Sequence, residues 1–172
     1  RNIPVSIIVR NKSLNWRLHD VASKLDVHVV DLTDPKLPEI ISKIKPTIIF
    51  HLATYGAISG EDAVEKMVDV NIMGTLNLIR AAKKTNFKLF VNTGSSSEYG
   101  MKVLPMRETD ILEPINDYGV SKASISLFCQ KIARIENLPI VTFRLFSPYG
   151  PFESKERFVP TVISHMLENK PL

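Results

Sequence analysis

The sequence is poor in several features that mark large classes of protein. Its one cysteine, Cys129, excludes a disulfide within the chain and lies in an apolar helical pattern typical of a small buried residue. No apolar run approaches the length of a membrane-spanning helix. The net charge of +4 comes without any block of lysine and arginine. We therefore expect no membrane partner, no nucleic-acid partner and a reducing, cytoplasmic location.

Metal-binding and phosphate-binding motifs are also lacking. None of the seven glycines forms the G-x-G-x-x-G loop that cradles a dinucleotide pyrophosphate. His51 has no cysteine, histidine or carboxylate at metal-ligand spacing, so no metal site is predicted and we expect a core histidine. The 172 residues, 44% of them hydrophobic, still suffice for one globular domain with a core.

What the chain does contain is a regular alternation of β-branched runs and helical stretches. The expected strands are 4–9, 27–30, 47–52, 87–93 and 138–145, and the expected helices are 15–25, 36–44, 63–84, 117–137 and 158–169. This order predicts an α/β fold with helices on both faces of a parallel sheet. The continuous apolar run 47–52 predicts a strand buried on both faces. Ligands then bind beyond the carboxyl ends of the strands.

Tyr118 and Lys122 form the most informative pair. Their spacing of four places both on one face of a predicted helix. An ammonium beside a phenol favours the phenolate and lowers the phenol pKa from about 10 toward neutral pH. Such a phenol can take a proton from an alcohol or return one to a ketone. By itself, the spacing is also typical of an exposed tyrosine and lysine on an ordinary amphipathic helix.

Carboxylates follow the second predicted strand, and their role stays open. Asp31 can accept a hydrogen bond from an adenine amino group, with Leu32 against the ring. Alternatively, one of the two aspartates caps the next helix, since Asp34 precedes Pro35 at a helix start.

Two other polar sites have a functional and a structural interpretation. The Ser95 hydroxyl lies at a strand end, where it can steady a developing oxyanion beside Tyr118, although serine and glycine there also suit a plain loop. Asn71 and Gly74 are poor residues for the interior of a helix. We expect close packing at Gly74 and a structural role for Asn71, with a bridge to backbone near the site as the alternative.

Six motifs at or near these strand ends occur in a fixed order: DLTD, FHLA, NIMGT, GSSSEYG, YGVSK and RLFSPYGP. Together they resemble the extended short-chain dehydrogenase/reductase family, which contains nucleotide-sugar epimerases, dehydratases and 4-keto-reductases. The resemblance covers nearly the whole chain. It implies a Rossmann-like doubly wound parallel sheet, NAD or NADP as cofactor, and a nucleotide-diphosphate sugar as partner.

The resemblance also implies roles for individual residues. Ser95, Tyr118 and Lys122 would be catalytic, with Tyr118 as general base and Lys122 tuning it and binding the nicotinamide ribose. The expected cofactor-binding residues are Arg10, Asp31, Leu32, Leu52, Ala53, Tyr118, Lys122 and Phe146. The expected substrate residues are Ser96, Ser97, Ser147 and Arg157. For Arg157, a contact with the diphosphate and a surface salt bridge both stay open.

The missing glycine-rich loop is a departure from the family pattern. It indicates that the chain begins at the family's second strand, lacks the first βα unit, and is a piece of a protein of roughly 300 residues. We expect a partial dinucleotide-binding domain over 1–150 and the start of the substrate-binding part over 151–172. Residues 1–172 alone should bind the cofactor poorly, and micromolar affinity for a dinucleotide would refute this expectation.

The second departure concerns the reaction. Family dehydratases carry an acid one or two positions after the catalytic hydroxyl, where this chain has Ser96 and Ser97; its first carboxylate is Glu98. We therefore favour an epimerase or a 4-keto-reductase acting at sugar C4 over a 4,6-dehydratase. A catalytically silent dinucleotide-sensing regulator is a further alternative.

Two basic residues bear on the choice of cofactor, and the family resemblance bears on assembly. Arg10 and Lys12, after the first predicted strand, favour the 2′-phosphate of NADP, although a solvated basic turn explains them equally simply. By analogy with the family, we expect a homodimer formed through the helices 63–84 and 117–137.

Overall fold

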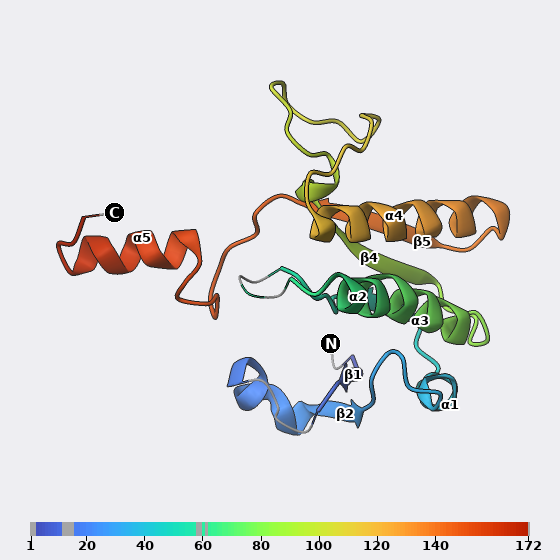
Figure 1. The fold of residues 1–172 in the computed structure, drawn as a ribbon. Helices are drawn as coiled ribbons and strands as arrows, with labels where there is room; N and C mark the ends of the chain where they lie inside the picture. Colours follow the sequence, from blue (N-terminus) through green and yellow to red (C-terminus); the bar gives the residue numbers. More distant parts are fainter. Residues whose placement is uncertain (1–2, 12–15, 58–59, 61, 172) are drawn as a thin grey trace.

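The computed structural model describes residues 3–11, 16–57, 60 and 62–171 (Figure 1). Lys12 lies outside these residues. The strands are β1 (Val5–Val9), β2 (Leu25–Val29), β3 (Ile48–His51), β4 (Leu89–Ser95) and β5 (Ile140–Leu145). The α-helices are α1 (Leu37–Ile44), α2 (Val64–Met67), α3 (Thr75–Ala82), α4 (Asp117–Ile135) and α5 (Phe158–Leu167). Two 3-10 helices, η1 (Trp16–Lys24) and η3 (Ser96–Glu98), and a π-helix, η2 (Val68–Gly74), complete the order.

All strand pairs are parallel, but they form two sheets. β1 pairs with β2, and a separate sheet has the order β3-β4-β5. The predicted parallel α/β fold is therefore confirmed, whereas the single expected sheet is not formed by the described residues. The prediction that a further βα unit belongs to this fold stays a prediction.

The helix boundaries follow local chemistry. Asn116 caps α4 with its side chain, which accepts a hydrogen bond from the Gly119 amide. A proline stands in the first turn of α1, and the helix ends at Lys45 in the left-handed conformation. The stretch 15–25 forms a 3-10 helix over Trp16–Lys24 instead of the expected α-helix, and residue 15 lies outside the described part.

A single long helical stretch was expected over 63–84, and the chain is helical throughout 64–82. Its middle, η2, has π geometry, with α2 before it and α3 after it. A π segment turns the helix more widely and is often found at functional sites. Both residues that sequence alone marks as poor in a helix, Asn71 and Gly74, lie in this segment and are buried.

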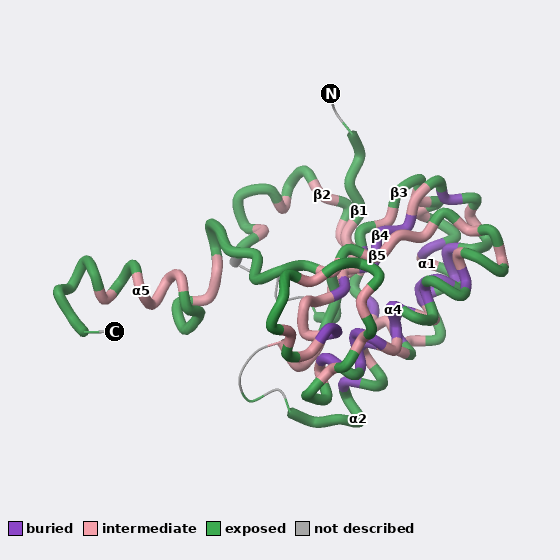
Figure 2. The backbone as a smooth tube through the Cα atoms, turned by 90° about the horizontal axis from the view of Figure 1, so that it is seen from above, coloured by how far each residue is buried: buried purple, intermediate pink, exposed green. Residues whose placement is uncertain are grey.

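The core lies on one face of the three-stranded sheet. Phe90 of β4 is fully buried between α3 and α4, whose buried residues include Ile79 and Ile125. Leu37 and Ile41 of α1 join the same cluster. In Figure 2 the buried positions gather along α1, α4 and the strands beside them. This cluster ties the β2–α1 segment to the larger sheet.

The opposite face of this sheet is open among the described residues. Ile48 and Phe50 of β3 are 51% and 66% exposed, and Phe143 and Leu145 of β5 are also exposed. The expectation that strand 47–52 is buried on both faces is therefore wrong. The reason is that α1, α3 and α4 all pack on the other face, and no described helix covers this one.

The C-terminal segment contributes little to the core. Helix α5 stands apart from the sheets and the other helices (Figure 1), and none of its residues is buried. No helix in the described ranges combines the length and apolar character needed to cross a membrane.

Candidate active site

Ser95 is the last residue of β4 and the N-cap of η3. Its Oγ accepts a hydrogen bond from the Ser97 amide at 3.1 Å. In return, its own amide donates to Glu98 Oε1 at 2.8 Å. This reciprocal arrangement is a capping box, which satisfies two backbone amides and fixes the turn. The predicted catalytic hydroxyl therefore sits on a locally rigid strand end.

The start of α4 approaches this turn closely because residue 119 is glycine. A Cβ at Gly119 would lie 2.6 Å from the Ser97 carbonyl oxygen, which is far inside van der Waals contact. Tyr118 is the neighbouring residue and is half-buried. The structure thus brings the backbone of the predicted Tyr118 beside the backbone of the predicted Ser95 turn.

Lys122 lies one turn further along α4 and is 3% exposed. Burial lowers the pKa of its ammonium group, and the Glu98 carboxylate opposes that shift. No hydrogen bond to Lys122 Nζ is made by the described residues. A buried ammonium without a hydrogen-bonding partner is available for a ligand oxygen.

A shallow hollow of about 280 Å³ opens beside the Ser95 turn. It is lined by Ser96, Ser97, Gly100, Met106, Ile115, Asn116 and Phe146. Three residues predicted for substrate or cofactor therefore meet here: Ser96 and Ser97 from η3, and Phe146 from the segment after β5. Hydroxyl and amide groups next to apolar side chains suit a sugar ring, with its polar rim and apolar face.

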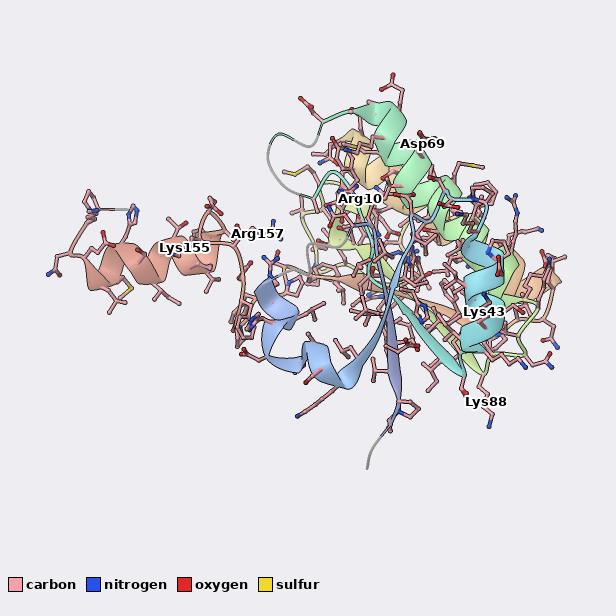
Figure 3. All side chains as sticks on the ribbon, turned by 90° about the horizontal axis from the view of Figure 1, so that it is seen from below. Arg10, Lys43, Asp69, Lys88, Lys155 and Arg157 are labelled. Atoms are coloured by element: carbon pink, nitrogen blue, oxygen red, sulfur yellow. The ribbon has the colours of Figure 1, made fainter. Side chains whose placement is uncertain are left out.

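Arg157 and Ser147 do not join that hollow. Arg157 lies where the chain enters α5 (Figure 3) and lines a second hollow of about 440 Å³ with Arg17 and Tyr149, among others. Its Nε pairs with Glu153 Oε1 at 3.4 Å, which supports the salt-bridge alternative. Ser147 is exposed and has a left-handed backbone, φ +37°.

The predicted adenine-side residues lie at the end of β2. Asp31 Oδ1 accepts hydrogen bonds from the Thr33 amide at 2.9 Å and the Thr33 hydroxyl at 2.7 Å, and these bonds lower the pKa of Asp31. Leu32 packs under Gly74, where an added Cβ would approach Leu32 Cβ to 3.0 Å, so the expected close packing is confirmed. Neither aspartate is the N-cap of α1, which is Lys36. Asp34 accepts from the Lys36 amide with Oδ1 at 2.8 Å and from the Leu37 amide with its carbonyl oxygen at 3.0 Å.

The remaining predicted cofactor residues are exposed. Arg10 follows β1, and Leu52 and Ala53 follow β3. Leu52 is 67% exposed. These residues directly follow the ends of their strands, as expected. Their contacts with the described residues do not assign them a role.

His51 is a core histidine, as expected. It is 4% exposed, and its Nε2 lies 2.7 Å from Thr75 Oγ1. Because the Thr75 hydroxyl donates to the Asn71 carbonyl, the His51 Nε2 carries the hydrogen and donates to Thr75. Burial and, to a lesser extent, the Lys122 charge lower the pKa of His51 to about 4. No group of potential metal ligands occurs among the described residues.

Asn71 acts as a bridge between the loop after β3 and helix α4. Its Oδ1 accepts from the Tyr55 amide, and its Nδ2 donates to the Tyr55 carbonyl, each at 2.8 Å. The same Nδ2 donates to Ser121 Oγ at 2.9 Å, and Ser121 in turn donates to the Tyr118 carbonyl. Asn71 therefore makes a bridge to backbone, as the alternative expectation held.

Sequence reasoning missed the pair Glu98 and Arg144. Glu98 is fully buried, and its Oε2 pairs with Arg144 Nε at 2.8 Å. Burial by itself would lower the pKa of Arg144, but the bonds to Glu98 and Tyr99 raise it above its ordinary value. The signal was present as Ser95-x-x-Glu98, the spacing of a capping box.

A parallel α/β fold with polar residues at the carboxyl ends of its strands defines the class of Rossmann-like proteins. Within this class, the sequence model described as the NAD dependent epimerase/dehydratase family matches residues 2–172, so the chain belongs to that family. The predicted family resemblance is confirmed.

Relatives in this family carry different activities. The UDP-glucose 4-epimerase of Mycoplasma pneumoniae is 27% identical, over 98% of this chain and 54% of the relative. The GDP-6-deoxy-D-mannose reductase of Pseudomonas aeruginosa is 31% identical, over 84% and 47%. The UDP-glucuronic acid 4-epimerase of Bacillus cereus, solved with NAD, is 28% identical over 91% and 50%, with a TM-score of 0.76. The chain thus spans about half the length of the curated relatives it matches.

Proposed function

We propose that the whole protein is a nicotinamide-dependent nucleotide-sugar epimerase or 4-keto-reductase that acts at sugar C4 without dehydration. The observation that carries this proposal is the approach of the α4 start, with Tyr118 and Lys122, to the capped Ser95 turn in a chain of this family. In the hollow beside them, Ser96 and Ser97 stand where a dehydratase needs an acid.

Each catalytic residue has one task in this proposal. Tyr118 accepts the proton of the C4 hydroxyl, so that the C4–H bond can break and a ketone can form. Ser95 donates a hydrogen bond to the same oxygen and holds it while its charge develops. Lys122 binds a ribose hydroxyl of the cofactor with its buried ammonium. When bound, the nicotinamide supplies or accepts the hydride of C4.

The residues fit such a cofactor in two places. The buried Lys122 ammonium, which has no hydrogen bond within the described part of the chain, suits the nicotinamide ribose. Asp31 and Leu32, at the end of β2, would hold the adenine, with Leu52, Ala53 and Phe146 lining the cleft. Arg10 would contact the ribose or its 2′-phosphate, and Arg157 the sugar-nucleotide diphosphate.

The variant Tyr118→Phe tests the catalytic assignment. We expect kcat to fall by about three orders of magnitude while binding of the nucleotide sugar stays nearly unchanged, because the phenyl ring keeps its shape and loses only the proton acceptor. Ser124→Ala, which removes a hydroxyl further along α4 that donates to the Val120 carbonyl, is the control. Full turnover by Tyr118→Phe would refute the assignment.

The two reactions and the silent-sensor alternative separate in a single assay. The whole protein is incubated with 4-hydroxy and 4-keto nucleotide sugars, while sugar products and reduced cofactor are followed. An epimerase gives a new sugar without net loss of reduced cofactor, a reductase consumes it, and a sensor does neither. Repeating the assay with NAD and NADP tests Arg10, because a strong preference for NAD would refute its role with a 2′-phosphate.

Assembly into a cytoplasmic homodimer belongs to the same proposal. Apolar side chains on α2, η2 and α4 are exposed, among them Val64, Val68, Leu127 and Phe128. They support a contact between copies through these helices, since such a patch buries well in a dimer. Leu127→Asp should therefore halve the mass in solution, whereas Val103→Asp, in a fully exposed loop, should leave it unchanged.

The division of the chain follows the same proposal. Residues 1–150 would form part of the cofactor-binding domain, and 151–172 would begin the substrate-binding part. The isolated position of α5, with its exposed Phe158 and Leu167, supports this division, since such side chains need a further surface to cover them.

A further inference from the structure

Glu98 uses both oxygens of its buried carboxylate on groups that shape the candidate site. Oε1 accepts from the Ser95 amide at 2.8 Å, and Oε2 accepts from Arg144 Nε at 2.8 Å. The side chain is fully buried in this pair. A buried carboxylate is retained only where its charge is matched and its oxygens are bonded, and both conditions hold here.

The surrounding residues leave room for this carboxylate. Gly94, directly before Ser95, has no side chain, and a Cβ there would lie 2.5 Å from Glu98 Oε1. Arg144 also donates to the Tyr99 hydroxyl at 3.0 Å, and its guanidinium lies over the Tyr99 ring. Tyr99 in turn contacts the ring of Phe146. The pair therefore connects Ser95, through Tyr99, with Phe146, which lines the hollow beside the Ser95 turn.

The capping box also decides what the Ser95 hydroxyl can do. The Ser97 amide donates to Ser95 Oγ, so one lone pair of this oxygen is occupied. The hydroxyl hydrogen finds no acceptor among the described residues and can be given to a ligand oxygen. Holding the Ser95 backbone through Glu98 thus presents the hydroxyl as a hydrogen-bond donor.

We propose that Glu98, held by Arg144, is a positioning residue that fixes the Ser95 hydroxyl as a donor to the substrate oxygen. The proposal rests on the C4 chemistry proposed above. Glu98 touches neither substrate nor cofactor in this role and acts through Ser95, while its charge separately opposes the lowering of the Lys122 pKa by burial. Replacing it with glutamine keeps the size and shape of the side chain but points an amide donor at either Arg144 or the Ser95 amide.

A double-mutant cycle in the whole protein tests the proposal. Glu98→Gln should lower kcat by about tenfold or more with KM changed less than about twofold. In a Ser95→Ala background, the same change should cost less than about twofold, because the group it positions is already gone. Glu113→Gln is the control, since Glu113 is an exposed carboxylate paired with Lys102. An equal loss of kcat in both backgrounds, or none in either, overturns the proposal.

An arm that needs no turnover separates this proposal from the proposed function. The Ser95 and Ser97 amides should exchange with solvent at least about tenfold faster in Glu98→Gln than in the unaltered protein and in Glu113→Gln. If no nucleotide sugar is turned over, the proposed function fails. Unchanged amide exchange in Glu98→Gln rejects the positioning role, whatever the outcome of the turnover assay. If Glu98→Gln does not fold, the double-mutant cycle with Ser95→Ala is repeated with Arg144→Lys. This variant keeps the charge but loses the simultaneous contact with Glu98 and Tyr99. Additive losses of kcat in that cycle would refute the proposal.

Discussion

Two regions of the molecule carry the two halves of the candidate site, and they are built differently. Of the described residues in the N-terminal region, 3–47, only Val30, Leu37 and Ile41 are buried hydrophobic residues. The central region, residues 48–145, holds the other buried hydrophobic residues that the structure describes and all eight described residues that are buried and polar or charged. These polar residues include His51, Asn71, Glu98 and Lys122.

The more rigidly held region is the one that contains the residues proposed for catalysis. In the central region, buried hydrogen bonds fix the Ser95 turn and the start of α4, as a proton transfer requires. In the N-terminal region, the residues proposed for the adenine end lie on a half-exposed strand end. Contact with a flat aromatic ring tolerates more freedom than alignment of a donor with one oxygen atom.

The largest expected contrast concerns ion pairs. Arg144→Met should lower the free energy of unfolding by about 3–5 kcal/mol, because it leaves the fully buried Glu98 carboxylate without its cation. Lys43→Met removes the Lys43–Glu39 pair on the surface of α1 (Figure 3), where the side chains are 71% and 67% exposed. This variant should change the free energy of unfolding by less than about 1 kcal/mol. Urea unfolding of the two variants measures the contrast, and equal losses would remove the distinction between the regions.

A second contrast concerns pH. The pKa of His51 is about 4 in the folded state, against about 6.5 when unfolded, so the unfolded chain binds more protons between these values. Stability should therefore fall as pH drops from about 6.5 to 4, by about 2–3 kcal/mol at pH 4.5. His51→Gln, which can still donate to Thr75, should abolish this part of the slope.

The comparison variant for pH lies in the N-terminal region. Asp26 has a lowered pKa, chiefly because of its hydrogen bond with His28. Its contribution is present above the unfolded value of 3.8 and is lost only as pH falls through the lower folded value. Asp26→Asn should therefore leave the change between pH 7 and 4.5 as it is. A slope that His51→Gln does not alter would show that His51 is not kept neutral by burial.

Sequence patterns predicted the strands and the helix α4 of the central region better than they predicted which faces of the sheet are covered. The strands and α4 were placed to within about two residues, since β-branched runs and the Asn116 cap are local signals. Helix type in η1 and η2 was missed, because 3-10 and π geometry depend on packing. The open face bearing Ile48 and Phe50 was also missed, since an apolar run shows that burial is favourable but does not show what covers it.

The candidate site shows the same limit. The motif order located Ser95, Tyr118 and Lys122, and the structure puts their backbone segments together. The motif order could not place Arg157, which lines a different hollow because its loop runs on toward α5. Nor did it reveal Arg144, whose partner Glu98 lies 46 positions away along the chain.

A third contrast concerns the close approach at α4. Gly119→Ala should destabilise the chain by about 3 kcal/mol and lower turnover, because the new Cβ would press on the Ser97 carbonyl and push Tyr118 away from Ser95. Gly150→Ala is the matched control, since nothing lies within 4 Å of a Cβ at that position. Its effect should stay within about 0.5 kcal/mol. A tolerated Gly119→Ala would mean that α4 does not depend on this contact.

The smallest effect compares one substitution in both regions. Val91→Ala in β4 removes two methyl groups from a side chain that is 3% exposed, and should cost about 2 kcal/mol. Val29→Ala in β2 removes the same groups from a side chain that is 45% exposed, and should cost less than about 1 kcal/mol. Urea unfolding gives both values under one condition. If Val29→Ala lowered the free energy of unfolding as much as Val91→Ala, β2 would have to be covered in solution by a surface that the described residues do not provide. The contrast between the N-terminal and central regions would then fail at that strand.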